Sequence, residues 1–432
     1  MNAVNYYKPI VMEKTMKAAP TPFTPYQKFA IFILSITQFT VILDFMIMSP
    51  LGDMLMKHFT LKPAQFGAAV AAYAFSAGAS GLLTAGFADR FDRKKLLLIF
   101  YTGFIAGTVF CGLAGSYPML LAARIITGLF GGVISSIGMA IITDIFSLQQ
   151  RGRVMGFVQM GFGASQALGV PIGIYLANHL GWQMPFLMVA GMAIVIVVLI
   201  GAKLQPVNKH LALQQDRNAF MHLWHTVKNK DYRIGFAATA LLSIGGFMMM
   251  PFGSAFAINN LKITSGQLTT LFMVAGVSSV VVMPLIGKLS DKMDKFKIFT
   301  YASLWMMIMV VLYTNLSATP LWEVIIFNVL MMTGVMSRMV PAGALTSAVP
   351  DMADRGAFMS VNSSLQQIAG GIAAGFAGFI VVQKTTYSPL EHYNTLGYVI
   401  VGITFICIVM VYRVSVIIKK KPVQQAVAAQ VA

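Results

Sequence analysis

Long apolar runs with few charges are the feature that most constrains this chain. Twelve of them occur along its 432 residues, and each approaches or exceeds the about 20 apolar residues that a helix needs to cross a bilayer. Strands of a transmembrane barrel would be about 10 residues long and would alternate in polarity. Only 10% of the residues are charged, too few to cover a soluble domain of this size. The sequence therefore predicts an all-α polytopic membrane protein with spans near 27–51, 64–87, 95–115, 118–145, 154–178, 184–203, 234–257, 265–287, 298–316, 320–346, 357–383 and 393–415.

The basic residues fall mainly on one side of these spans. Of the 31 Lys and Arg, 25 lie in the two tails, the middle loop and the loops after the second, fourth, eighth and tenth spans. Positive residues are retained on the cytoplasmic side of a membrane, so both termini and the middle loop are expected there. This topology accounts for the net charge of +17, and we expect no nucleic-acid partner. The expected location is the plasma membrane, as in a multi-pass protein of a bacterial inner membrane.

The two parts of the chain repeat each other. Residues 89–93 (DRFDR) follow the second span, and residues 291–295 (DKMDK) follow the eighth span, 202 residues later. QRG at 150–152 and DRG at 354–356 correspond in the same way after the fourth and tenth spans. Matching loops at matching places indicate an internal duplication with parallel halves. The predicted organisation is a cytoplasmic tail (1–26), a six-helix bundle (27–203), a middle loop (204–233), a second bundle (234–416) and a cytoplasmic tail (417–432).

An amphipathic helix is predicted within the middle loop. Its apolar residues follow i, i+3, i+4, i+7 spacing at Phe220, Leu223, Trp224 and Val227, which is typical of a helix lying on a membrane surface. The nearby histidines, at 222 and 225, could act as a pH sensor or as a pair of metal ligands. We interpret them as solvated surface residues.

Several motifs resemble those of the major facilitator superfamily, specifically its twelve-helix drug/proton antiporters. That family has Gly-x-x-x-Asp-Arg-x-Gly-Arg-Arg/Lys after the second helix, and here Asp89, Arg90, Arg93 and Lys94 match. Ala85 stands at the leading glycine and Asp92 at the second one. A further family motif, Arg-x-x-x-Gly in helix 4, is met by Arg124 and Gly128.

The fifth span carries a third similarity. The family's antiporter motif usually ends Gly-Pro-x-x-Gly-Gly, and this chain reads Gly-Val-Pro-Ile-Gly at 169–173. This variant is most similar to the sugar, nucleoside and chloramphenicol exporters. The resemblance implies two pseudo-symmetric six-helix bundles around a central site that opens alternately to the two faces. It also implies that the charged loops hold the cytoplasmic side closed, with Asp89, Arg90, Arg93 and Asp144 as the latch and Asp291 and Lys292 as its second copy.

Asp44 and Arg124 are the candidate proton-coupling residues. A carboxylate within a span is costly, by about 2.5–3.5 kcal/mol, so Asp44 should face the protein interior and serve a function. Both residues lie about 10 Å below the outer surface if each residue rises 1.5 Å, so they can meet. A proton and a substrate could then compete for the carboxylate. The alternative is a permanent structural ion pair, and we favour proton coupling.

Small residues recur every four positions in the fifth span, at Gly161, Ser165, Gly169 and Gly173, with Pro171 beside them. Such a face allows close helix approach, and the proline permits a kink. The small residues of this helix can serve either static packing or a moving interface, and the sequence leaves both alternatives open. A weaker stripe at Gly371, Gly375 and Gly378 is interpreted in the same way. Arg338 is interpreted as extending toward the cytoplasm from its helix. The candidate cavity residues are Thr37, Met48, Thr127, Ser135, Met249, Asn362 and Gln366.

Taken together, the sequence predicts a monomeric secondary transporter that exports a drug-like compound, sugar or nucleoside in exchange for protons. It predicts no enzyme and no cofactor, because the chain has no nucleotide-binding loop, catalytic constellation or metal cluster. A facilitator or proton symporter is the main alternative. A transporter-like receptor is a more remote one.

Overall fold

The computed structural model describes residues 22–85, 91–208, 211, 219–351, 354–385 and 387–431. Over these residues the chain forms two helical bundles joined by a linker that contains α9 (Ala219–Lys228). The first bundle consists of α1 (Pro25–Ile47), α2 (Gly52–His58), α3 (Pro63–Ala85), α4 (Arg93–Gly112), α5 (Tyr117–Ile145), α6 (Leu148–Ala164), the π turn η2 (Ser165–Gly169), α7 (Val170–Leu180) and α8 (Met184–Lys203). The second consists of α10 (Lys230–Phe247), the 3₁₀ turn η4 (Met250–Phe252), α11 (Gly253–Asn259), α12 (Ser265–Lys292), α13 (Lys295–Thr314), α14 (Leu321–Ser347), α15 (Arg355–Ile380) and α16 (Tyr393–Val431).

The predicted twelve-span architecture is confirmed in its main features. Among the described residues, eleven helical segments are long and apolar enough to cross a membrane. The one remaining predicted span, the eleventh along the chain (357–383), corresponds to α15, whose 26 residues also suffice in length. This helix is more polar because it carries Asn362, Gln366 and Gln367. The polypeptide is therefore a multi-pass membrane protein.

Two spans that the sequence predicts as continuous helices are interrupted. The fifth contains the π turn η2 immediately before Pro171, and the seventh contains η4 around Pro251. Proline lacks the N–H that would continue the helical ladder, so each proline coincides with a change of helix type. The first span also ends earlier than predicted, at Ile47, and the chain then turns into the short helix α2.

The repeated charged loops have the same local structure. Asp92 caps α4 and Asp294 caps α13, and each of these helices has 20 residues. Each carboxylate accepts hydrogen bonds from the backbone N–H groups two and three residues further on, at 2.8 and 3.4 Å in the first half and at 2.9 and 3.2 Å in the second. A capping carboxylate of this kind typically stabilises a helix by about 1 kcal/mol. One acid of each repeat is thus explained by helix initiation.

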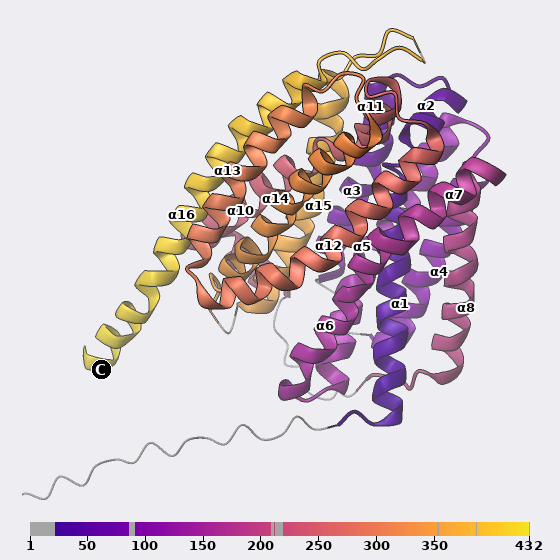
Figure 1. The fold of residues 1–432 in the computed structure, drawn as a ribbon. Coiled ribbons are helices and arrows are strands. Elements are labelled where there is room, and N and C mark those ends of the chain that lie inside the picture. Colours follow the sequence, from indigo (N-terminus) through magenta and orange to yellow (C-terminus); the bar gives the residue numbers. More distant parts are fainter. Residues whose placement is uncertain are drawn as a thin grey trace, which may run out of the picture.

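The apolar cores show where the two halves join. One large cluster contains side chains of both halves, including Leu51 and Leu55 near α2 and Phe252 and Phe256 near α11. A second cluster is built mainly by the first half, and a third mainly by the second half around Phe236 and Phe358. We call the shared end of the molecule the α2–α11 end, and the opposite end, where α1 begins and α16 finishes, the terminal end (Figure 1).

The helix predicted in the middle loop is present as α9. Leu223 packs against the core of the second half, whereas Trp224 and Val227 are exposed. Lys228 Nζ lies over the Trp224 ring, 4.9 Å from the ring centre. His225 is exposed. The side chain of His222 lies outside the described residues, so the alternatives for the histidine pair stay predictions.

Candidate functional site

A fully buried ion pair lies inside the first bundle. Arg124 on α5 donates from Nη1 to Oδ2 of Asp44 on α1 at 2.8 Å, and both side chains are 0% exposed. Thr108 on α4 donates to the other carboxylate oxygen at 3.3 Å. The structure thus brings together the two residues that the depth argument paired. A buried ion pair is stabilised only with good geometry and further hydrogen bonds, and removing one partner leaves a costly unpaired charge.

The surroundings of Arg124 are closely packed. Its guanidinium lies 4.4 Å from the centre of the Tyr73 ring of α3, a cation–π contact. Gly107 lets α4 approach α5, since an added Cβ would lie 2.6 Å from Thr127 Oγ1. Two of the guanidinium nitrogens, Nε and Nη2, have no hydrogen-bond partner in the described structure. The pair and the side chains that contact it therefore come from four helices, α1, α3, α4 and α5, while part of the hydrogen-bonding capacity of the guanidinium is unused.

Buried hydroxyls continue from Asp44 along α1 and α4. Thr37, Thr40 and Asp44 follow i, i+3, i+7 spacing and share one face of α1. Thr40 Oγ1 and the Tyr101 hydroxyl are 2.7 Å apart, and Tyr101 precedes Thr108 by two helical turns on α4. Thr37 Oγ1 has no hydrogen-bond partner in the described structure. These groups, with Thr108, form what we call the hydroxyl column.

The hydroxyl column ends at a cavity between α1, α4, α5 and α6. Its enclosed volume is about 60 Å³, and the empty space reaches about 470 Å³ only when the open mouth is counted. The cavity in this conformation is therefore smaller than the about 300–1,000 Å³ that is common for ligand sites of small organic molecules. The polar lining consists of uncharged groups, and Ser135 donates to Gln38 Oε1 at 2.9 Å. The lining residues are Leu34, Thr37, Gln38, Leu97, Ile134, Ser135, Gly138, Met139, Met155, Val158 and Gln159.

Two of the seven predicted cavity residues, Thr37 and Ser135, line this cavity. Met48 is buried in the shared core, and the Thr127 hydroxyl donates to a backbone carbonyl of its own helix at 2.7 Å. The remaining three, Met249, Asn362 and Gln366, are half-buried in the second half. Sequence reasoning missed Gln38 and Gln159. An amide within an apolar span was the available signal for both.

Arg338 does not extend toward the cytoplasm, and that prediction was wrong. The side chain is 1% exposed and lies between α10, α13, α14 and α16. Snorkelling requires the helix face that carries the residue to border lipid or water. Here that face is covered by the other helices of the second half.

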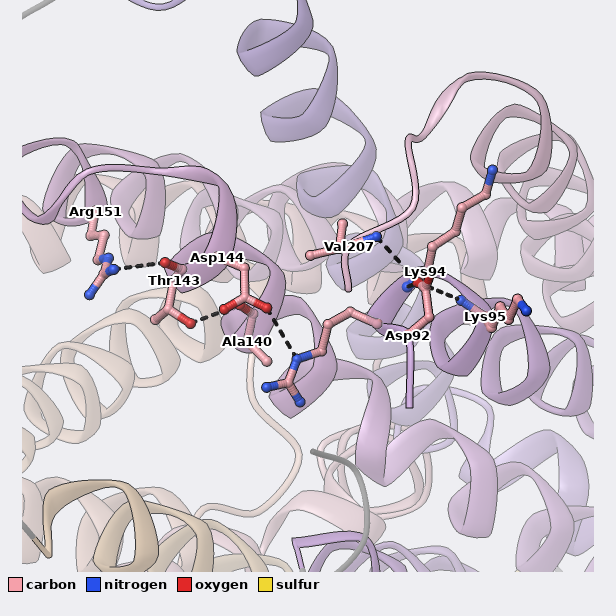
Figure 2. Close-up of polar contacts among 9 residues, drawn as sticks. Asp92, Lys94, Lys95, Ala140, Thr143, Asp144, Arg151 and Val207 are labelled. Carbon is pink, nitrogen blue, oxygen red and sulfur yellow. Dashed lines mark hydrogen bonds and ion pairs between the residues drawn. The ribbon is translucent and has the colours of Figure 1, made fainter. Parts of the chain in front are cut away.

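Part of the predicted cytoplasmic latch can be placed. Arg93 donates from Nε to Asp144 Oδ2 at 3.3 Å, joining α4 to the end of α5 within the first half. Figure 2 shows Asp144 beside Thr143, whose carbonyl accepts from Arg151 at 2.7 Å, and Asp92 accepting from the Val207 N–H at 3.3 Å. Asp89, Arg90 and the side chain of Asp291 lie outside the described residues, and Lys292 is exposed. A latch between the halves stays a prediction.

The small residues of the fifth span pack within the first half. An added Cβ would lie 3.0 Å from a backbone oxygen of α1 at Gly161, and 2.7 Å from Leu43 of α1 at Gly169. Gly173 is close to Ile47 of the same helix. The span nevertheless contacts the other half through η2, which lies against Gly276 of α12. Pro171 is buried at the start of α7.

The stripe of α15 lies between the halves, against α3. At Gly378 an added Cβ would be 3.0 Å from Ala64 Cα, and at Gly371 it would be 3.2 Å from the Ala71 carbonyl oxygen. From the α3 side, a Cβ at Gly67 would lie 2.7 Å from the Ala374 carbonyl oxygen. Glycines on both helices therefore allow this close contact.

Hydrogen bonds join the halves at the α2–α11 end, where the two short helices lie side by side (Figure 1). Asn259 of α11 donates to Asp53 Oδ1 of α2 at 2.7 Å, and Lys57 pairs with Oδ2 at 2.7 Å. Ser254 donates to the Ser49 carbonyl oxygen at 2.7 Å. We call these residues the α2–α11 gate. Sequence reasoning missed it, although Asp53 lies directly after an apolar span.

Comparison with known proteins identifies the family to which this architecture belongs. The model of the Major Facilitator Superfamily matches residues 34–373 and 235–430. The chain belongs to the major facilitator superfamily. The uncharacterised MFS-type transporter YceJ of Bacillus subtilis is 24% identical over 395 residues, covering 90% of this chain and 96% of the relative. A probable sugar efflux transporter of Mannheimia succiniciproducens is 22% identical, covering 67% of this chain and 66% of the relative.

Solved structures of the family share the fold. A bacterial homologue of the human lysosomal transporter Spinster, crystallised in an inward-facing, unoccupied conformation, superimposes with a TM-score of 0.73 at 15% identity, covering 92% of this chain and 99% of that one. The nucleoside transporter NupG gives a TM-score of 0.70 at 15% identity, covering 90% and 99%. The family match and the relatives together identify the polypeptide as a membrane transporter of small solutes and not an enzyme.

Proposed function

We propose that this transporter exports an uncharged or weakly polar organic solute in exchange for protons across a bacterial plasma membrane. The observation that carries the proposal is the ion pair of Asp44 and Arg124, buried inside a membrane-spanning bundle. Ionisable residues at such depth are costly and commonly serve proton or ion pathways. Two relatives are named as probable sugar efflux transporters, which supports export of a small solute.

Protonation of Asp44 would remove the charge that Arg124 compensates. The guanidinium would then keep an uncompensated charge, so the packing of α1 against α5 would favour a different arrangement. Asp44 lies in the last turn of α1, which ends at Ile47, and Ser49 of the α2–α11 gate follows two residues after that end. A shift of α1 caused by proton exchange at Asp44 would therefore reach the α2–α11 gate over only five residues of chain.

The hydroxyl column supplies a route for the proton. It extends from Thr37 at the cavity toward Asp44, with one hydrogen bond between Thr40 and Tyr101 and another between Thr108 and Asp44; water would have to bridge the intervals between these pairs. Hydroxyls both donate and accept, so such a chain, with water in the cavity, can pass a proton to a buried carboxylate. With the terminal end in the cytoplasm, as the distribution of basic residues favours, the proton would leave Asp44 on the cytoplasmic side.

The cavity lining favours an uncharged solute. Its four polar members, Thr37, Gln38, Ser135 and Gln159, offer hydroxyls and amides, which suit sugars and nucleosides. Leucine, valine and methionine side chains provide the apolar part. This composition keeps a drug-like compound in the panel of candidate substrates.

The decisive experiment is proton movement in proteoliposomes under an imposed pH gradient. Apolar antibiotics, pentoses and nucleosides are added in turn to wild type, Asp44→Asn and Glu391→Gln. Glu391 forms an exposed ion pair with Lys384, so it serves as a control for loss of one carboxylate. We expect one solute class to release protons from wild type and Glu391→Gln, and not from Asp44→Asn.

Other results would replace the proposal. Solute movement without protons, unaffected in Asp44→Asn, would make the protein a facilitator and the pair a structural one. Protons and solute moving in the same direction would indicate symport. Binding of labelled solute without counterflow would favour a receptor.

A further inference from the structure

Arg338 is a buried cation with weak partners. Its Nη1 donates to the Met306 thioether sulfur at 2.9 Å and to Thr404 Oγ1 at 3.3 Å, and its Nη2 lies 3.9 Å from the Cys407 sulfur. Thioether and thiol sulfurs are poor acceptors. The Nε group has no hydrogen-bond partner in the described structure. The guanidinium is therefore under-satisfied in a place that water does not reach.

No carboxylate of the described residues pairs with this cation. The described ion pairs of the protein involve other arginines and lysines, and Arg124 of the first half has its own acid, Asp44. Buried charges in proteins are normally paired or coordinated, because removing an ion from water is costly. Arg338 thus lacks the negative charge that its burial calls for.

The internal duplication shows where that charge is missing. Pro50 and Gly52 correspond to Pro251 and Gly253, 201 residues later, and the same offset places Gly245 opposite Asp44. A Cβ added to Gly245 would lie 3.6 Å from Thr404 Oγ1 and 3.9 and 4.0 Å from the two terminal nitrogens of Arg338. The second half has a glycine where the first half has its carboxylate, and Arg338 reaches that glycine from the tenth span.

We propose that Arg338, Thr404 and Gly245 form a binding site for a compact anion inside the second bundle. The guanidinium supplies the charge and directional donors, and the Thr404 hydroxyl can donate its own proton, which has no acceptor among the described residues. Gly245 leaves room for the anion on the side that Asp44 occupies in the first half. The anion is either inorganic, such as chloride, or the carboxylate of a solute. The inference does not depend on proton coupling at Asp44.

The test measures thermal unfolding of the purified full-length protein, followed by the fluorescence of its four tryptophans. Chloride or acetate replaces the bulkier methanesulfonate at constant ionic strength. A ligand that binds only the folded state raises the melting temperature, and we expect a saturable rise of about 2 °C or more in wild type. The variants are Gly245→Asp, which fixes a carboxylate at the site, its size control Gly245→Ala, and Arg338→Met.

The expected pattern distinguishes site binding from a general salt effect. Gly245→Asp should melt higher than Gly245→Ala without either probe and should gain nothing from them. Gly245→Ala, whose Cβ takes up part of the space beside Arg338 and Thr404, should show a smaller rise, and Arg338→Met should lose it. A rise with chloride identifies an inorganic ion, whereas a rise with acetate alone identifies a carboxylate. An equal rise in Arg338→Met, or none in wild type together with equal melting of the two Gly245 variants, overturns the proposal. If Arg338→Met does not fold, the Gly245 pair decides.

Discussion

Replacing Asn259 by alanine should open the α2–α11 gate. The substitution removes the 2.7 Å hydrogen bond from α11 to the buried carboxylate of Asp53 on α2, which is a contact between the two halves. A hydrogen bond to a charged group contributes about 1.5–3 kcal/mol. Lys57 still pairs with Asp53 in the variant, so we take the lower value. Since 1.4 kcal/mol is a factor of ten, the equilibrium should shift about tenfold toward forms open at this end.

Double electron–electron resonance measures the shift directly. Nitroxides are attached to cysteines introduced at Ser116 and Ala318, which are exposed and lie in loops of the two halves at the α2–α11 end. The native Cys111 and Cys407 are buried and should stay unlabelled. We expect a longer-distance population to grow about tenfold relative to the short one.

Asn260→Ala is the matched control. Asn260 is the next residue of the chain, but its side chain exchanges hydrogen bonds with Leu390 inside the second half, at 2.9 and 2.8 Å. It should leave the distance distribution unchanged. If Asn259→Ala also leaves the distribution unchanged, or if both variants change it equally, the contact to Asp53 does not hold this end closed.

Three further predictions test packing and electrostatics by thermal unfolding. Arg124→Met alone should destabilise the protein by about 3–5 kcal/mol by leaving Asp44 unpaired, and adding Asp44→Asn should restore most of the loss; an additive double variant contradicts the coupling. Gly67→Leu should abolish the α3–α15 contact and yield little folded protein, because its Cβ would already meet a backbone oxygen at 2.7 Å; normal yield and melting would refute close packing there. The hydrogen bond from Lys419 lowers the pKa of Asp294, so wild type should have a higher melting temperature than Lys419→Met at pH 7. This difference in melting temperature should vanish as the pH falls below about 4, where the carboxylate becomes protonated. A difference that stays constant with pH would show that the ionised Asp294 carboxylate is not its source.

The sequence was sufficient for the features that depend on position along the chain. Hydropathy alone delimits the spans, because the bilayer penalises each exposed polar group separately. The equal spacing of the charged loops reveals the duplication, and the two Asp caps at 92 and 294 show that the copies fold alike locally. The meeting of Asp44 and Arg124 also followed, since depth within a membrane can be counted at 1.5 Å per residue.

Depth alone did not predict Arg338. A residue near the end of a span can extend to water or stay buried, and the choice depends on the face that its helix turns toward its neighbours. The partners that surround Arg338 are Met306, Thr404 and Cys407, which are 32, 66 and 69 residues away in the chain. No local pattern around position 338 contains them.

The same limit applies to the contacts between the halves. The glycine stripes of the fifth span and of α15 look alike in sequence, yet one packs on α1 within its bundle and the other on α3 of the opposite bundle. Asp53 meets Asn259 across 206 residues. The sequence by itself determined which segments enter the membrane, how deep each polar group lies and that the chain is built twice. Only the tertiary structure decided which faces meet, because packing energy arises between pairs of surfaces, whereas the cost of entering the bilayer is set residue by residue.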